Sequence, residues 1–189
     1  MSPRFLRIIA LTFTFAPGVF PGAQAVEYTD VNATASTIRF TYKQMGSKMY
    51  GTFGKFEGDL DFDTNHPEAA RAKLIIALDS IDAGSEDANT ELQKPAWFDT
   101  ARYPVATFES TRFTDLGNNR YQITGNLTLR GLTREVTVPV LLKAENAIGI
   151  FDGELVLKRS DFKIGDGEWA DTMVSDGINI RFRMVAPQR

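Results

Sequence analysis

The stretch FEGDLDFD, Phe56 to Asp63, decides the fold class because two kinds of residue alternate in it. Every second residue from Phe56 to Phe62 is apolar or glycine, and every residue between and after them is acidic. A period of two residues is typical of a β-strand with one dry face and one wet face. The pattern alone leaves open whether the dry face meets a filled core or a space kept for a ligand.

The first 25 residues have the features of a secretory signal peptide. Arg4 and Arg7 precede an apolar run from Ile8 to Phe15, and the small-residue sequence AQA ends at Ala25. The run is too short to cross a membrane as a helix. We therefore predict a signal peptide at 1–25 and one mature domain at 26–189, with a retained amphipathic anchor as the alternative.

Composition excludes several classes of function. Without Arg4 and Arg7 the chain holds 19 basic and 24 acidic residues, so no basic surface for nucleic acid is expected. The absence of cysteine excludes disulfides, thiolate catalysis and thiolate metal sites. The single histidine, His66, lies in the turn sequence NHPE, where we expect a solvated side chain. A calcium-binding loop that begins at Asp59 would need glycine at its sixth position, where this chain has Thr64. We therefore predict no metal site. We also predict no cofactor.

Strand patterns dominate the rest of the mature chain, and turn sequences such as TNHPE, DLGNN and RGLT separate them. The alternating runs lie at 38–42, 74–78, 107–113, 121–130, 136–142, 151–157 and 178–184. One short helix is predicted at 86–93, with Ser85 as its N-cap and Pro95 beyond its end. About eight or nine one-sided strands predict an all-β, antiparallel sandwich or barrel, and closure of the sheet removes its sticky edges.

The interior of such a barrel either just fills with side chains or holds one small ligand. Gly58, Gly125 and Gly153 fall on inward faces, which indicates either strand curvature or a close approach to the backbone. Trp97 and Phe98 follow Pro95 in a loop. We predict that this apolar pair plugs one end of the barrel and shapes that end of a ligand cavity.

Four segments together resemble the YceI-like family of exported bacterial proteins. They are GTFGKFEGDLDFD at 51–63, LQKPAWFDTARYPVATFES at 92–110, TGNLTLRGLTREVTVPV at 124–140 and RSDFKIG at 159–165, the last with Lys163 in place of a glycine. The resemblance implies an eight-stranded antiparallel lipocalin-like barrel, located in the periplasm, whose cavity holds a long-chain isoprenoid lipid of the polyprenyl or ubiquinone type. The family often carries a histidine after its first strand, and Gln44 stands there in this chain. A histidine charge switch is therefore absent at that position.

From these observations we predict a non-catalytic protein that holds an isoprenoid for transport, storage or sequestration. The predicted wall of the cavity consists of large apolar residues on inward faces, with the Trp97–Phe98 pair at one end. The predicted ligand-binding residues are Phe40, Phe56, Leu60, Phe62, Leu74, Ile76, Leu78, Trp97, Phe98, Phe108, Ile123, Leu127, Val138, Leu155, Ile180 and Phe182.

Two other classes of function stay open at this stage. One is an enzyme that acts on a lipid or quinone through a carboxylate such as Asp161 or Asp171. The other is an interaction module that makes transient contact with a membrane or a membrane cytochrome through the acidic stripe Glu57–Asp63. A homodimer through a barrel face is compatible with either class.

Overall fold

The computed structural model describes residues 25–166 and 173–189, and within them eleven strands form one antiparallel sheet. The predicted signal peptide, except for Ala25, lies outside the described residues. The strands are β1 (Glu27–Thr29), β2 (Thr37–Gln44), β3 (Ser47–Phe53), β4 (Phe56–Asp63), β5 (Arg71–Ala77), β6 (Ile81–Asp82), β7 (Val105–Asp115), β8 (Arg120–Leu129), β9 (Leu132–Glu145), β10 (Ile148–Lys158) and β11 (Gly177–Pro187). The all-β prediction is confirmed, but the predicted count of eight strands is not.

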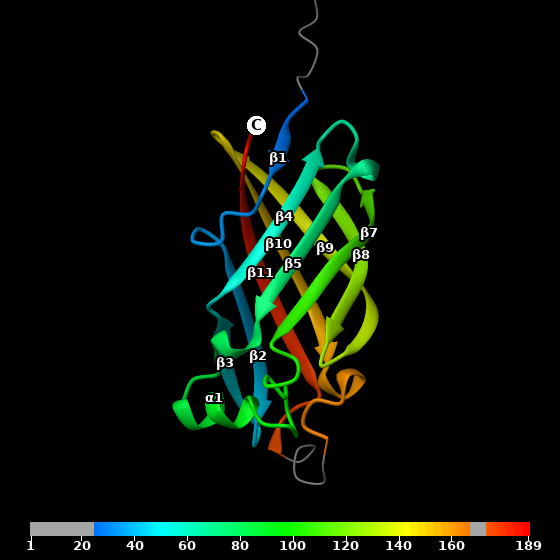
Figure 1. The fold of residues 1–189 in the computed structure, drawn as a ribbon. Helices are drawn as coiled ribbons and strands as arrows, with labels where there is room; N and C mark the ends of the chain where they lie inside the picture. The colour runs from blue at the N-terminus through cyan, green and yellow to red at the C-terminus, as the bar shows by residue number, and fades with distance from the viewer. Residues whose placement is uncertain (1–24, 167–172) are drawn as a thin grey trace, which may run out of the picture.

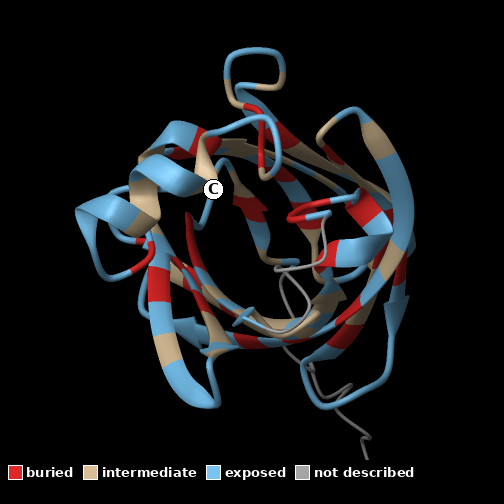
Figure 2. Ribbon diagram, turned by 90° about the horizontal axis from the view of Figure 1, so that it is seen from below, coloured by how far each residue is buried: buried red, intermediate tan, exposed pale blue. Residues whose placement is uncertain are grey.

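The sheet curls on itself, as the view along its axis in Figure 2 shows. Its order is β1-β4-β5-β7-β8-β9-β10-β11-β2-β3-β6. The short strands β1 and β6 form the two edges of this sheet, and each connects to a strand on the other side of the gap. The β-bridge between Tyr28 and Gln188 joins β1 to the end of β11, and β6 follows β5 directly through the 3₁₀ turn η2 (Leu78–Ser80). The count exceeds eight because β1 and β6 are separate short segments and because β3 and β4 have different partners.

Tight turns keep neighbouring strands in register. The β2–β3 hairpin turns at Met45 and Gly46, and the β8–β9 hairpin turns at Arg130 and Gly131. All four residues have positive φ, between 49° and 83°. Two-residue turns with positive φ at both positions match the right-handed twist of the strands that they join.

One α-helix lies beside the lower end of the sheet in Figure 1, near the β2–β3 hairpin. Helix α1 spans Glu86–Leu92, and the Ser85 hydroxyl accepts a hydrogen bond from the Ala88 amide at 3.2 Å. This N-cap satisfies one of the amides that a helix start leaves unpaired, and the predicted helix is confirmed to within one residue. Single 3₁₀ turns occur at η1 (Pro67–Ala69) and η3 (Arg159–Phe162). None of the helices among residues 25–166 and 173–189 is long and apolar enough to cross a membrane.

The interior divides into two apolar clusters, one above the other. The upper cluster, at the end that carries β1 and the C terminus, is built around five aromatic rings. They belong to Tyr28, Phe62, Phe113, Tyr121 and Phe151. The lower cluster lies beside α1 and contains Leu78 of η2, Phe162 of η3 and Phe98 of the 93–104 loop. We call these regions the filled half and the lower half.

Candidate ligand-binding cavity

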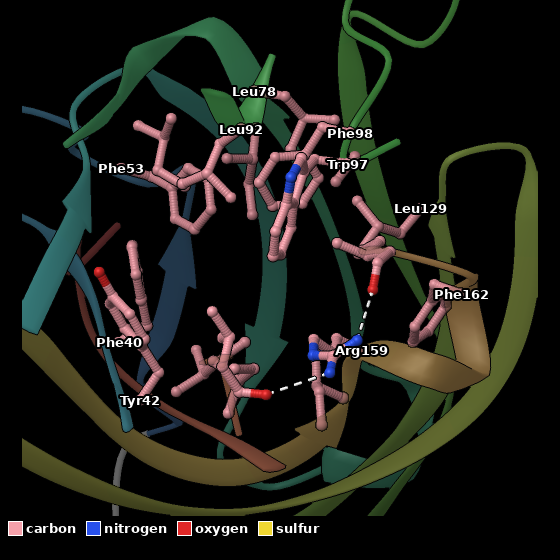
Figure 3. Close-up of a pocket in the computed structure, with 18 of the residues that line it drawn as sticks. Phe40, Tyr42, Phe53, Leu78, Leu92, Trp97, Phe98, Leu129, Arg159 and Phe162 are labelled. Atoms are coloured by element: carbon pink, nitrogen blue, oxygen red, sulfur yellow. Dashed lines mark hydrogen bonds between the residues drawn. The ribbon is translucent and has the colours of Figure 1, made fainter. Parts of the chain in front are cut away.

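A cavity of about 220 Å³ occupies the lower half of the sheet. That volume is many times what a single water molecule requires. Figure 3 shows aromatic and aliphatic side chains directed into the space from several strands and from the segments that cover the end. The residues that line it from strands and η2 include Phe40, Tyr42, Gln44, Phe53, Ile76, Leu78, Ile81, Ala106, Leu127, Leu129, Leu157, Ile178 and Ile180.

Strand alternation explains why these side chains face the cavity. On β2, Phe40, Tyr42 and Gln44 are two residues apart and share the inward face. On β11, Ile178 and Ile180 follow the same rule. The same face of each strand continues into the filled half, so β2 contributes Ile38 to the upper cluster.

Three non-strand segments cover the lower end of the cavity. Helix α1 contributes Leu92, the loop that follows it contributes Trp97 and Phe98, and η3 contributes Phe162. The Trp97 ring lies so close to Gly165 that a β-carbon there would be 2.6 Å from a ring carbon. These large apolar groups close the end with hydrocarbon surface.

Arg130 makes hydrogen bonds to two of the covering segments. Its guanidinium donates to the Pro95 carbonyl at 2.5 Å and to the Lys163 carbonyl. Pro95 belongs to the loop that carries Trp97, and Lys163 follows η3. Arg130 itself sits in the β8–β9 turn, so the cover is fastened to the rim of the sheet.

Arg159 is a buried cation beside an apolar cavity, with 5% of its surface exposed. Its guanidinium donates to the carbonyls of Ile164 and Gly165 at 3.0 Å and to the carbonyl of Val174 at 3.1 Å. Dashed lines at Arg159 in Figure 3 mark hydrogen bonds to other residues of the lining. Burying a charge is costly unless hydrogen bonds compensate. These bonds hold the chain after η3 against the chain that leads into β11.

Tyr42 and Glu91 also line the cavity, together with the polar side chains of Gln44 and Lys158. The Tyr42 hydroxyl donates to the Ala83 carbonyl at 3.1 Å, and burial raises the pKa of Tyr42 above its usual value. Glu91 lies at the rim, where the hydrogen bond from Lys94 lowers the pKa of its carboxyl group. The tyrosine is therefore neutral and the glutamate ionised at neutral pH, so neither is poised to exchange a proton near pH 7.

Of the two carboxylates considered for catalysis, the one in the described residues does not line the cavity. Asp161 lies in η3 with its side chain exposed and does not line the space. Asp171 lies outside the described residues. Within the described residues, no group of three or more histidine, aspartate or glutamate side chains is arranged to hold a metal ion.

The acidic stripe on β4 has basic neighbours. In the register of β4 and β5, Asp59 lies opposite Lys73 and Asp61 lies opposite Arg71. Basic residues therefore flank the middle of the stripe, whereas Glu57 lies opposite Ile75 and Asp63 lies opposite Glu27 of β1.

Seven of the sixteen predicted site residues line the cavity. They are Phe40, Ile76, Leu78, Trp97, Phe98, Leu127 and Ile180. The other nine lie elsewhere on the inward side: Phe56, Leu60, Phe62 and Val138 are buried in the filled half, and Leu74, Ile123, Leu155 and Phe182 pack against it. Phe108 places its ring over Gly125. The nine differ from the seven mainly in their height along the barrel, which a period of two residues does not specify.

Several lining residues were not predicted from the sequence. Tyr42, Leu129 and Ile178 share the faces of predicted residues, so strand alternation could have identified them. Leu92 and Phe162 come from helical segments that carry no strand pattern. Nothing in the local sequence places these two residues against the cavity.

The inward glycines do not widen the cavity, because side chains of other residues cover them. A β-carbon on Gly153 would lie 2.2 Å from the Phe182 ring, and one on Gly125 would lie 2.5 Å from the Phe108 ring. Gly58 is covered by Val31 instead. A phenylalanine that covers a glycine on the adjacent strand restores the packing that glycine lacks.

A family model described as the YceI-like domain matches residues 30–186. Among similar proteins, Protein YceI of Salmonella agona is 33% identical over 164 residues, which cover 82% of this chain and 85% of that protein. A UPF0312 protein of Pseudomonas aeruginosa is 34% identical over 150 residues, which cover 75% of this chain and 78% of that protein.

Solved structures share the fold. BcnA of Burkholderia cenocepacia is 38% identical with a TM-score of 0.80, over 83% of this chain and 99% of that one. A domain of Saccharophagus degradans, described as a polyisoprenoid binding domain implicated in plant cell wall breakdown, is 19% identical with a TM-score of 0.66. That likeness covers 85% of this chain and 98% of the domain, and at this identity it concerns the fold alone.

Proposed function

The chain belongs to the YceI-like family, and from this premise we propose that it is a non-catalytic binding protein for an isoprenoid lipid. The observation that carries the proposal is the apolar cavity in the lower half of the sheet. A protein of the same fold is described as a polyisoprenoid binding domain, which supports this class of ligand.

The energetics of the cavity suit a hydrocarbon ligand. Burial of hydrocarbon contributes about 0.8 kcal/mol per CH₂ group, and the lining offers phenylalanine, leucine and isoleucine side chains to the part of a chain that enters the cavity. The costs of ordering the chain and of association reduce that sum. A polyprenyl or ubiquinone-type tail is a ligand of this kind.

We propose further that the protein acts in the periplasm, where it carries, stores or sequesters the lipid. The support is the N-terminal pattern of Arg4 and Arg7, an apolar run and the AQA sequence. A binding protein in an aqueous compartment would shield an isoprenoid tail from water.

The proposal is tested by native mass spectrometry of protein purified from its own host and from a recombinant host without delipidation. We expect an added mass that organic solvent removes and that is identified as an isoprenoid. Ala106 lines the cavity, and an Ala106→Phe substitution should fill it and abolish the added mass.

A matched control is Thr107→Phe, which adds the same ring at the next position of β7, on the opposite face of the strand. It should leave the bound lipid in place. An unliganded mass from both hosts, together with no binding of any added prenyl alcohol, would refute the proposed function.

A further inference from the structure

The hollow part of the sheet ends partway along its axis. Phe53, Ile76 and Ile180 line the cavity and also pack against the cluster of the filled half. They are therefore the residues at which the cavity stops. We call these three the floor.

Strands β11 and β5 each change from cavity-lining residues to residues of the filled half at a floor residue. On β11, Ile178 and Ile180 line the cavity, whereas Phe182, two residues further along, packs against the filled half. On β5, Ile76 lines the cavity and Leu74 packs against the filled half. On these two strands, which are not neighbours in the sheet, the interior changes from hollow to filled just beyond the floor residue.

The space beyond the floor is occupied by aromatic side chains. The Phe182 ring covers Gly153 just above the floor, and Phe62 behind it is fully buried and contacts four other rings. A ligand that passed the floor would have to displace the partly buried Phe182 ring and then the buried rings of the filled half, and overpacking a buried cluster is costly.

The floor sets the depth of the cavity. On β2 the lining runs from Gln44 to Phe40, four residues or about 13 Å of strand. At a strand tilt of about 40° this distance corresponds to a depth of about 10 Å.

We infer that the floor formed by Phe53, Ile76 and Ile180 limits the enclosed part of the ligand to a length of about 10 Å, on the order of ten carbons or two isoprene units. The inference rests on the proposed function and narrows its ligand class. A short prenyl compound is enclosed completely. A longer one is enclosed over its end, and its remainder lies outside the cavity.

The test is a binding series of prenyl alcohols with 5, 10, 15 and 20 carbons, measured by displacement of an apolar fluorescent dye. Each enclosed carbon should tighten binding about two- to fourfold. From 5 to 10 carbons the Kd should therefore fall at least about 30-fold. From 15 to 20 carbons it should change by less than about threefold, because those carbons gain no enclosure.

Substitutions at Ile180 and Ile178 of β11 distinguish the effect of the floor from the effect of the cavity wall on ligand length. Ile180→Ala removes three carbons at the floor. The ratio of the Kd of the 10-carbon alcohol to the Kd of the 15-carbon alcohol should therefore rise about tenfold. Ile178→Ala removes the same atoms nearer the mouth of the cavity and should leave that Kd ratio unchanged. Ile180→Phe raises the floor and should lower the ratio, which keeps the test decisive if the alanine variant is poorly folded.

A Kd that keeps falling steeply from 10 to 20 carbons in the native protein would overturn the inference and leave the proposed function standing. An equal effect of Ile178→Ala and Ile180→Ala on the ratio would also overturn it. Binding of no alcohol at any length would instead refute the proposed function.

Discussion

Replacing Phe62 by alanine should destabilise the fold while leaving the ligand cavity intact. Phe62 has no exposed surface, and its ring centroid lies 5.0 Å from that of Tyr121, 5.5 Å from that of Phe151 and 6.0 Å from that of Phe113. Truncation of a packed phenylalanine costs about 3–5 kcal/mol, and ring pairs add about 0.5–1.5 kcal/mol each. We expect a loss of about 4–5 kcal/mol, in the upper part of the first range. At about 2–4 °C per kcal/mol for a domain of this size, Tm should fall by about 8–20 °C.

Urea unfolding and calorimetry measure this loss, and Phe40→Ala is the matched control. Phe40 is also buried, at 6% exposure, but it borders the cavity and so has fewer packed neighbours on that side. Its truncation should cost about 2–3 kcal/mol, near or below the low end for phenylalanine, and should weaken prenyl alcohol binding. A loss below about 2 kcal/mol for Phe62→Ala would refute the division into a filled and a hollow half. An effect on ligand affinity as large as that of Phe40→Ala would refute it as well.

Two further predictions concern packing and charge. Gly153→Ala would place a β-carbon 2.2 Å from the Phe182 ring and should cost about 1–3 kcal/mol, whereas Gly177→Ala meets nothing closer than 3.6 Å and should be close to neutral; equal urea midpoints for the two variants would contradict the prediction. The hydrogen bond with Asp63, 2.9 Å from the His66 ring nitrogen, raises the pKa of His66 and lowers that of Asp63. The raised pKa of His66 stabilises the folded state fully below the unfolded pKa of about 6.5, and this contribution is lost as pH rises through the folded pKa. The lowered pKa of Asp63 stabilises the folded state above its unfolded pKa, and this contribution is lost as pH falls through the folded pKa. An NMR titration of this single histidine should show a lower pKa in Asp63→Asn, and an unchanged value would show that the contact is absent in solution.

The side of each strand that faces inward could be predicted from the sequence because it depends on the backbone alone. Successive residues of a strand point to opposite faces, and on β4 Phe56, Leu60 and Phe62 are buried while Glu57 and Asp59 are exposed. The start of α1 was predictable for a similar reason, since the Ser85 cap is a contact between residues three apart.

The height at which the interior becomes hollow could not be predicted in this way. Leu74 and Ile76 are both apolar, lie two residues apart on β5 and face inward, yet only Ile76 lines the cavity. The difference depends on which side chains reach across from distant strands, and the rings that fill the upper half come from β1, β4, β7, β8 and β10. Their meeting is set by strand order and register, which a local pattern does not contain.

The two halves of the interior also differ in how the chain is held around them. At the filled end the two chain ends are joined to each other: Tyr28 of β1 bridges Gln188, and the Arg189 amide donates to the Glu27 carbonyl at 2.9 Å. At the hollow end the covering segments are short, and Arg130 and Arg159 fasten them through hydrogen bonds to backbone carbonyls. Segments with few packed apolar neighbours open at a lower free energy than a core does. We therefore expect the short covering segments to open before the aromatic cluster does, and that cluster maintains the fold around the cavity.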